Sequence, residues 1–321
     1  MGVDARTATR VVGVVVAWNR RDLLAQTLSG LAAQTRGLDG LVVIDNASTD
    51  DSAALARAHP GVTEVVTLPH NTGGAGGFAA GIARAVATHD ADLVWLMDDD
   101  TVPTPTALEA LLDARAAYPG RVSVAASRAD WRDGREHPMN RPRPRPGASR
   151  VLRGAAAMAD AVPIRSASFV SILVDAAAVR RHGLPEADYF LWNDDFEYTA
   201  RLLRDGVGLY VPASRVYHLT KVFGSSDADP GPRFVNEVRN KLWVFTRSDA
   251  LGPADRVLYA GATALRWARM LARSPHRGPL LAWGREGLAA GVRAPRPTRQ
   301  VLAGTPVAAD VEQIERGAGR A

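Results

Sequence analysis

The first hundred residues alternate between short runs of β-branched side chains and longer stretches rich in alanine and leucine. The apolar runs predict buried strands at residues 11–17, 41–44, 62–68 and 93–97. Apolar side chains at helical spacing predict helices between them, at residues 22–34, 52–58 and 78–88. Repeated strand–helix–strand units of this length predict a parallel sheet with helices on both faces.

Polar residues follow every one of these predicted strands. They are Trp18-Asn19-Arg20, Asp45-Asn46, His70-Asn71 and Asp98-Asp99-Asp100. Ligands of open parallel sheets bind beyond the carboxyl ends of the strands, so the four groups are expected to share one rim. Asn and Asp also favour turns and caps, which would explain any one group alone. The four groups together indicate a binding site.

Asp98-Asp99-Asp100 places three carboxylates directly after a buried strand. Ionising all three at such short range is costly unless a cation lies nearby. Hard oxygen ligands suit Mg²⁺ or Mn²⁺, and such ions commonly bridge to substrate phosphates. The alternative is an acidic turn that caps the next helix. The position beside other polar strand ends favours the metal site.

A second acidic group, Asp194 and Asp195, follows an aromatic-rich segment. These carboxylates either cap the start of a helix, where the helix dipole favours negative charge, or supply a general base. Glu197 and Arg201 are four residues apart, which predicts a structural ion pair. His218 ends a strand-like run, and its position is equally compatible with a metal ligand and a structural histidine.

Other segments exclude some enzyme classes and mark loops. The glycine-rich residues 71–77 predict a turn into a helix that lets backbone approach a nucleotide closely. Their spacing does not match G-x-G-x-x-G and no P-loop lysine follows, so nicotinamide enzymes and P-loop NTPases are disfavoured. No cysteine is present, which excludes disulfides and thiolate zinc sites. The Arg- and Pro-rich residues 132–153 predict an exposed loop, and residues 224–231 a mobile loop.

The net charge of +5 is unevenly spread. Residues 231–321 hold 15 basic and 7 acidic side chains, whereas residues 1–230 hold 24 and 27. We therefore predict a catalytic domain at residues 1–230 and a basic helical region at residues 231–321 with disordered final residues. Trp, Leu and Arg are mixed at residues 265–271 and 280–283. This composition is typical of a helix that lies on anionic lipid, and a helix packed on the catalytic domain is the alternative. The main domain is net acidic, so nucleic acid is not a predicted partner.

Four motifs in order resemble family 2 glycosyltransferases of the GT-A fold, over roughly residues 11–250. Residues 14–20 resemble the family's opening T-[FY]-N-R, with Ala17 in place of the usual Thr. The other motifs are D-[ND]-x-S-x-D at residues 43–50, D-x-D at residues 98–100 and [ED]-D-x-[DE] at residues 194–197. Residues 71–78, 192–195 and 216–218 are similar to actinobacterial galactofuranosyltransferases and their rhamnosyltransferase relatives.

This resemblance implies a nucleotide-diphospho-sugar transferase fold, with a mostly parallel central sheet, helices on both faces and a C-terminal helical extension. The donor nucleotide would be held by Trp18, Arg20, Asp45, Asn71, Gly73 and Asp98. The metal, Mg²⁺ or Mn²⁺, and the diphosphate would be held by Asp98, Asp100 and His218. The catalytic carboxylates would be Asp195, as the base, and Asp194.

The acceptor would be met by Trp192 and by Ser171, where many relatives have glycine. Arg239 lies with Arg233, Asn240 and Lys241 in a predicted helix. All four are candidates for the acceptor's diphosphate, since arginine suits bidentate phosphate contacts. A solvated helix face is the alternative.

The resemblance further implies an inverting transfer of galactofuranose or rhamnose from a UDP- or dTDP-linked donor. The acceptor would be a polyprenyl-diphosphate-linked glycan or a polysaccharide of the cell wall or cell surface. No apolar run reaches the roughly 20 residues that a bilayer requires, so a cytoplasmic protein held peripherally on the inner face of the plasma membrane is expected. Alternatives are a nucleotidyltransferase of similar fold, or a nucleic-acid-binding protein. No pattern indicates an oligomeric state.

Overall fold

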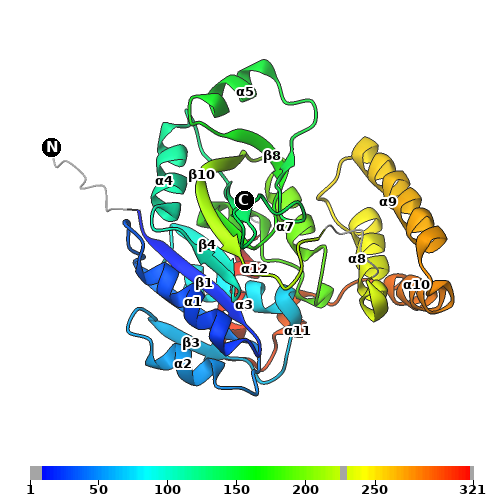
Figure 1. Ribbon diagram of the computed structural model, residues 1–321, viewed down its shortest axis with the longest axis horizontal. Helices are drawn as coiled ribbons and strands as arrows, with labels where there is room; N and C mark the ends of the chain where they lie inside the picture. The colour runs from blue at the N-terminus through cyan, green and yellow to red at the C-terminus, as the bar shows by residue number, and fades with distance from the viewer. Residues whose placement is uncertain (1–8, 225–229, 319–321) are drawn as a thin grey trace.

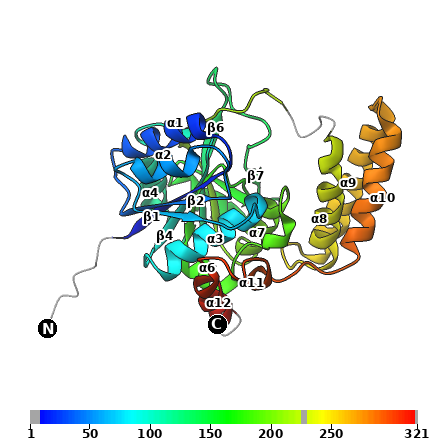
Figure 2. The same ribbon diagram turned by 90° about the horizontal axis from the view of Figure 1, so that it is seen from below.

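The computed structural model describes residues 9–224 and 230–318. One mixed sheet is covered by helices on both faces, and a group of C-terminal helices stands beside it (Figures 1 and 2). Most of the predicted mobile loop and the last three residues lie outside the described residues, so the predicted mobility and terminal disorder are not tested.

The strands are β1 (Val11–Ala17), β2 (Gly40–Asp45), β3 (Glu64–Thr67), β4 (Leu93–Asp98), β5 (Thr101–Pro103), β6 (Val124–Asp130), β7 (Arg143–Pro144), β8 (Val162–Ser166), β9 (Ser171–Asp175) and β10 (Gly208–His218). The helices of the first part are α1 (Arg21–Ala32), α2 (Ser52–Ala58), α3 (Gly73–Ala87), α4 (Ala107–Ala117), α5 (Arg150–Ala157), α6 (Ala176–His182) and α7 (Asp194–Leu202), with a 3₁₀ turn η1 (Ala187–Tyr189). A second 3₁₀ turn η2 (Gly231–Arg233) precedes α8 (Phe234–Thr246), α9 (Pro253–Arg273), α10 (Arg277–Gly291), α11 (Thr298–Val301) and α12 (Ala308–Gly317).

The strand order is β3-β2-β1-β4-β9-β6-β10-β8-β7, with β5 paired to β10. β1, β2, β3 and β4 are parallel, as predicted, while β9 runs antiparallel to both β4 and β6. Since β4 and β6 are both antiparallel to β9, they run in the same direction, and β10 is parallel to β6. β10 therefore runs in the same direction as β4. The carboxyl ends of β1, β2, β4 and β10 therefore meet at one edge of the sheet.

Two apolar cores lie on the two faces of the sheet. One contains α3, α6, α7 and α12, and the other contains α1, α2, α4 and α5. α3 lies so close to β1 that a Cβ at Gly81 would be 2.2 Å from Val14 Cγ1. The helix also begins at Gly73 instead of at the predicted residue 78, so the glycine-rich motif is its first turn. Packing against the sheet thus overrides the low helix propensity of glycine.

The Arg- and Pro-rich segment is more structured than predicted. β7 pairs with β8 at the end of the sheet, where proline is tolerated because the outer edge needs no donor. α5 begins at Arg150. His137 and Asn140 are buried, although the segment around them was predicted to be an exposed loop.

The C-terminal helices divide into two groups. α8, α9 and α10 form a separate lobe beside the sheet, with a small apolar core of their own (Figure 1). α11 and α12 return to the sheet, where Leu302, Val311 and Ile314 complete the core under α3 and α6 (Figure 2). Thr298 Oγ1 also donates to Pro185 O at 2.7 Å. The last helices are therefore part of the sheet's own packing.

Candidate active site

Asp98 ends β4 and His218 ends β10, so the shared sheet edge brings these two distant residues together. The antiparallel pairing of β5 with β10 aligns His218 with Thr101 and holds Asp100 beside the imidazole. His218 Nε2 lies 3.1 Å from Asp100 Oδ1. Arg20, in the turn after β1, places Nη1 2.7 Å from Asp100 Oδ2 and 3.1 Å from Asp99 Oδ1. We call Asp98, Asp99 and Asp100 the β4 acidic cluster.

Burial and neighbouring charges shift the pKa values of the β4 acidic cluster and of His218. Burial, with help from the Asp100 charge, raises the pKa of Asp98 to about 7. Burial likewise raises the pKa of Asp99 to about 6, against the charge of Arg20. At Asp100 burial acts in the same direction, but the close contact with His218 and its charge outweigh it and the pKa is lowered. Burial lowers the pKa of His218, but Asp100 more than offsets this and the pKa is raised.

The residues of this cluster fit a divalent cation. Ligand atoms of Asp98, Asp100 and His218 all lie within 4.8 Å of one another. They offer two carboxylate oxygens and an imidazole nitrogen, a donor set that suits Mg²⁺ or Mn²⁺. Asp100 Oδ1 is buried and accepts no well-aligned hydrogen bond, so it retains a free lone pair for a metal.

Asn140 orients the candidate histidine ligand. His218 Nδ1 lies 2.8 Å from Asn140 Oδ1, which leaves Nε2 directed at Asp100. Histidine ligands commonly donate their other ring N–H in this way, which fixes the ring and its tautomer. Asn140 is buried in the segment that the prolines predicted to be an exposed loop. The sequence carries no signal that could have singled it out.

Asp194 and Asp195 open α7 after a strained segment. Phe190, Trp192 and Asn193 have φ of 61°, 68° and 65°, a region that side chains other than glycine rarely adopt. Such conformations cost about 1–3 kcal/mol each and persist only where the surroundings enforce them. We call residues 189–193 the α7 entry segment.

Two helices hold the α7 entry segment. Asn240, on α8, is fully buried and shares its amide hydrogens among the carbonyl oxygens of Tyr189, Leu191 and Trp192, at 2.9, 2.9 and 2.7 Å. From the other side, the N-terminus of α3 reaches Phe190, whose carbonyl oxygen lies 3.2 Å from Ala75 N. Gly73 has φ +70°, and a Cβ there would lie 2.0 Å from the same oxygen. Glycine at position 73 thus permits the close approach of α3.

The two catalytic candidates are tightly coupled carboxyl groups. Burial raises the pKa of Asp195, while the charges of Lys241 and Arg143 oppose the rise. Burial and the Asp195 charge raise the pKa of Asp194, and Asp98 adds to the effect. Asp195 Oδ1 also accepts from Phe196 N at 2.6 Å. A partly buried carboxylate of raised basicity is suited to accept a proton.

The candidate nucleotide residues lie on the same edge of the sheet. Asp45 is buried at the end of β2, where Oδ1 accepts from Ser48 N at 3.1 Å. Asn71 Oδ1 accepts from Gly73 N at 2.7 Å and stabilises the start of α3. Trp18 is half exposed, and its backbone N–H donates to Asp99 Oδ2 at 3.0 Å. The structure therefore brings four nucleotide candidates to the rim that also carries Arg20 and Asp98. They are Trp18, Asp45, Asn71 and Gly73.

A cavity of about 870 Å³ separates the sheet from the C-terminal lobe. Asp195 and Trp192 line it from the catalytic side, together with Arg143. Lys241 and Arg266 line it from α8 and α9. The carboxylate of Asp195 is therefore reached from this interlobe cavity.

Ser171 and Arg239, the other two acceptor candidates, make internal contacts. Ser171 is buried within the sheet, where its hydroxyl accepts from Trp95 Nε1 at 3.0 Å and bonds to Ser127 Oγ at 2.8 Å. Arg239 donates to the carbonyl oxygens of Asp188 and Tyr189, at 3.1 and 2.8 Å. Neither side chain lines the interlobe cavity, and a role in acceptor binding stays a prediction for both.

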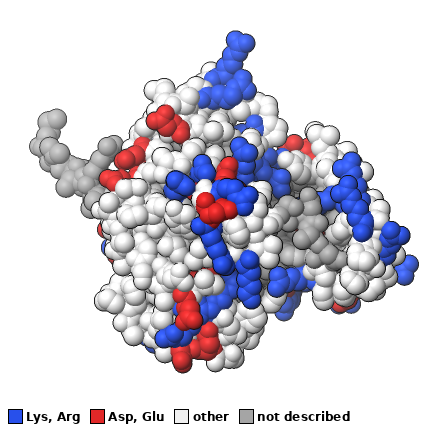
Figure 3. Space-filling view, viewed as in Figure 1, with Lys and Arg blue, Asp and Glu red and all other residues white. Residues whose placement is uncertain are grey.

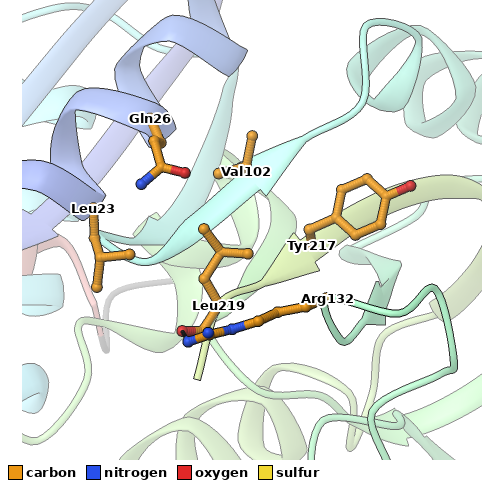
Figure 4. A pocket seen from close by; sticks show the side chains of 6 residues that line it. All are labelled: Leu23, Gln26, Val102, Arg132, Tyr217 and Leu219. Carbon is orange, nitrogen blue, oxygen red and sulfur yellow. Dashed lines mark hydrogen bonds between the residues drawn. The ribbon is translucent and has the colours of Figure 1, made fainter. Parts of the chain in front are cut away.

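A second hollow, of about 540 Å³, lies beside β5 (Figure 4). Leu23 and Gln26 reach it from α1, Val102 from β5 and Tyr217 from β10. Its one charged lining residue among the described part of the chain, Arg132, donates to Leu219 O at 3.1 Å. This hollow contains none of the candidate site residues. None of the described helices combines the length and apolarity needed to cross a bilayer.

Comparisons with solved structures identify the fold. S. aureus TarS 1–349 in complex with UDP-GlcNAc superposes with a TM-score of 0.61 at 14% identity, covering 96% of this chain and 88% of that one. Mannosyltransferase PcManGT from Pyrobaculum calidifontis, in complex with GDP-Man and Mn²⁺, gives a TM-score of 0.53 at 18% identity, covering 97% and 87%. The expected GT-A fold, with its mainly parallel central strands and C-terminal helices, is confirmed.

Sequence comparisons identify the family. Two curated relatives carry the name galactofuranosyltransferase GlfT1. The one from Mycolicibacterium smegmatis is 32% identical over 206 residues, which is 63% of this chain and 68% of the relative. The one from Mycobacterium tuberculosis is 34% identical over 201 residues, 61% of this chain and 66% of the relative. Residues 14–177 match the family described as glycosyl transferase family 2. The chain therefore belongs to glycosyltransferase family 2 and is a glycosyltransferase.

Proposed function

We propose that this glycosyltransferase transfers galactofuranose or rhamnose, with inversion, from a UDP- or dTDP-linked donor to a lipid-linked or polysaccharide acceptor of cell-wall or cell-surface glycan synthesis. One observation supports the proposal: Asp98, Asp100 and His218 could together hold a metal ion, and the carboxylate of Asp195 lines the interlobe cavity. The names of the curated relatives favour galactofuranose.

On the donor side, Asp45 and Asn71 hold the nucleotide, and the half-exposed Trp18 covers it. Arg20 contacts the diphosphate in this proposal, because its side chain is 49% exposed while its guanidinium pairs with Asp99 and Asp100. Asp98, Asp100 and His218 would hold Mg²⁺ or Mn²⁺. A bound divalent ion would neutralise the charge that develops on the leaving diphosphate, which is worth several kcal/mol.

On the acceptor side, Asp195 accepts the proton of the attacking hydroxyl. The acceptor hydroxyl, deprotonated by Asp195 in the interlobe cavity, attacks the anomeric carbon on the side opposite the leaving diphosphate. The configuration at that carbon is therefore inverted. Trp192 provides an apolar face for the acceptor sugar at the same end of the cavity. The polyprenyl-diphosphate-linked glycan suggested by the sequence agrees with the basic lining of this cavity.

A donor panel tests the proposal. UDP-galactofuranose, dTDP-rhamnose and UDP-glucose are each incubated with the full chain, Mn²⁺ and a short lipid-diphosphate glycan, and nucleotide release and product stereochemistry are measured. We expect acceptor-dependent release from one of the first two donors, with an inverted linkage. Turnover of UDP-glucose alone, or a retained configuration, would contradict the proposal.

An anionic membrane surface is the proposed partner of the C-terminal lobe. Leu258 and Leu265 on α9 are 68% and 51% exposed, and Leu288 on α10 is 49% exposed. Arginine side chains gather over the outer edge of these helices (Figure 3). Exposed leucines beside arginines complement acyl chains beside anionic headgroups.

Vesicle flotation tests this partner. The double variant Leu258→Glu, Leu265→Glu is expected to lose binding to phosphatidylglycerol vesicles, and wild type is expected to bind phosphatidylcholine vesicles weakly. Val151→Glu, at an exposed valine on α5, is the matched control. Unchanged flotation of the double variant would rule out this face.

A further inference from the structure

Lys241 is a buried cation on the wall of the interlobe cavity. It is one of two lysines in the chain and is only 9% exposed. Its Nζ lies 4.6 Å from the ring centroid of Phe196, which follows Asp195. Burial lowers the pKa of Lys241 to about 8. Charged lysines are seldom buried in this way unless something pairs with them.

No described carboxylate forms an ion pair with Lys241. Glu237, one turn earlier on α8, is already engaged: it pairs with Arg266, and Oε2 accepts from Asn193 Nδ2 at 2.7 Å. Seven basic side chains line the cavity against two acidic ones, Asp195 and Glu237. The cavity therefore holds an excess of positive charge that is not neutralised by the described side chains around it.

The apolar part of the lining is equally specific. Met139 contributes to it from the catalytic side, and Phe234, Trp267 and Met270 contribute from the C-terminal lobe. An acceptor that combines an anionic group with a hydrocarbon chain would find both surfaces in one cavity. A free sugar or a neutral polysaccharide would leave Lys241 without a partner.

We infer that Lys241 is the anchor for a diphosphate group of the acceptor, with Arg143 and Arg266 completing the site. This inference rests on the proposed function and extends it to a binding site for one chemical group. Lys241 and Asp195 line the same cavity, so an acceptor anchored through its diphosphate presents its sugar hydroxyls to the base. Lys241 is thereby a specificity residue for diphosphate-linked acceptors.

The scarcity of lysine makes a direct binding test practical. Reductive ¹³C-methylation labels Lys241, Lys221 and the N-terminal amine, and a Lys221→Met protein assigns the signals. We expect inorganic pyrophosphate to shift the Lys241 resonance saturably and to leave the exposed Lys221 resonance unchanged. Equal shifts at both lysines, or no shift at Lys241, would overturn the site. In a separate titration, UDP and Mn²⁺ are added without pyrophosphate. If they shift the Lys241 resonance as far as pyrophosphate does, Lys241 belongs to the donor site and the inference is overturned.

Kinetics provide the second test. Lys241→Met keeps the length of the side chain and removes a buried charge, so folding is expected to survive. We expect KM for a lipid-diphosphate acceptor to rise about 10- to 100-fold while the affinity for UDP, measured by calorimetry, stays the same. Lys241→Arg should restore part of the acceptor affinity, and Lys221→Met should leave KM unchanged. If Lys241→Met raised the KM of the sugar donor and left the KM of the acceptor unchanged, Lys241 would not be the anchor of the acceptor's diphosphate.

The two tests separate failure of this inference from failure of the proposed function. If the wild-type chain transfers none of the tested sugars, the proposed function fails, and the pyrophosphate titration still reports on the site. If transfer occurs but neither pyrophosphate nor Lys241→Met has the expected effect, the anchor is wrong and the glycosyl transfer stands.

Discussion

The β4 acidic cluster and the Asp194–Asp195 pair are both rich in carboxylates, yet they are held in place differently. Asp99 and Asp100 are bound by charged side chains, Arg20 and His218, at the ends of other strands. The α7 entry segment before Asp195 is held through its backbone carbonyls, by a buried amide on α8 and by the start of α3.

This difference reflects what each cluster has to do. A cluster that would bind a cation needs a high density of negative charge, kept stable by nearby positive groups until the cation is present. A base needs one carboxylate at a fixed position, and a cation bonded to it would lower its basicity. Neutral backbone contacts fix the position of Asp195 without forming an ion pair to it.

The largest expected effect comes from removing the base. Asp195→Asn should lower turnover by about 10²- to 10⁴-fold, because the acceptor hydroxyl loses its proton acceptor. Metal binding and UDP binding should persist, since the β4 acidic cluster is unchanged. Steady-state kinetics with calorimetry for UDP and Mn²⁺ provide the measurement.

The pH profile of kcat/KM is a second readout for the same variant. Burial raises the folded pKa of Asp195, so the wild-type rate should fall as pH drops through that raised value. Asp195→Asn should lack this acid limb. Asp205→Asn, at an exposed carboxylate, is the control. An acid limb that survives in Asp195→Asn would show that another group is the base.

Asp100→Ala tests the metal cluster and should lower turnover by about 10²- to 10³-fold, the equivalent of several kcal/mol of leaving-group stabilisation. Calorimetry with Mn²⁺ alone should show a clear loss of affinity. Asp113→Ala, at an exposed residue on α4, should bind Mn²⁺ like wild type. An unchanged Mn²⁺ titration of Asp100→Ala would exclude this cluster as the metal site.

Asn140→Ala should weaken Mn²⁺ binding or activity about 10- to 100-fold, because His218 loses the acceptor that orients its ring. Calorimetry with Mn²⁺ in the absence of acceptor is the diagnostic measurement, because Asn140 also lines the interlobe cavity. Asn140→Asp keeps an oxygen acceptor and should retain more affinity. A variant with normal metal affinity would mean that β10 alone positions His218.

Asn240→Ala tests how the base is held. Three carbonyl oxygens lose a buried donor, which should cost about 1–3 kcal/mol of stability. Thermal unfolding should show a lower Tm, and kcat should fall while the affinity for Mn²⁺ is unchanged. Asn236→Ala, on the same helix, removes a side chain without hydrogen bonds to described residues. Equal losses in both variants would indicate that only general helix stability is affected.

The sequence predicted the sheet well where local pattern and tertiary environment agree. β1 and β2 are buried throughout, so their apolar runs match the observed strands to within a residue or two. It failed where packing overrides propensity. α3 starts five residues early because glycine allows close contact with β1 and with the α7 entry segment. The apolar run at residues 169–174 indicates a strand, but the antiparallel direction of β9 was not predicted, since a buried apolar strand carries no signal of its direction.

Residue chemistry alone therefore indicated the candidate carboxylates of the site. Asp98, Asp100 and Asp195 stand out in the sequence because buried carboxylates beside strands and helices are costly unless they have a use. The tertiary structure alone decided which residues orient and surround them. Asn140 comes from a proline-rich segment that carries no signal of its role. The sequence marked Asn240 and Lys241 only as part of a polar helical stretch that could meet a diphosphate, and their buried contacts exist only in the folded chain. Their importance depends on burial and distance, which exist only once the sheet edge and the C-terminal lobe have come together.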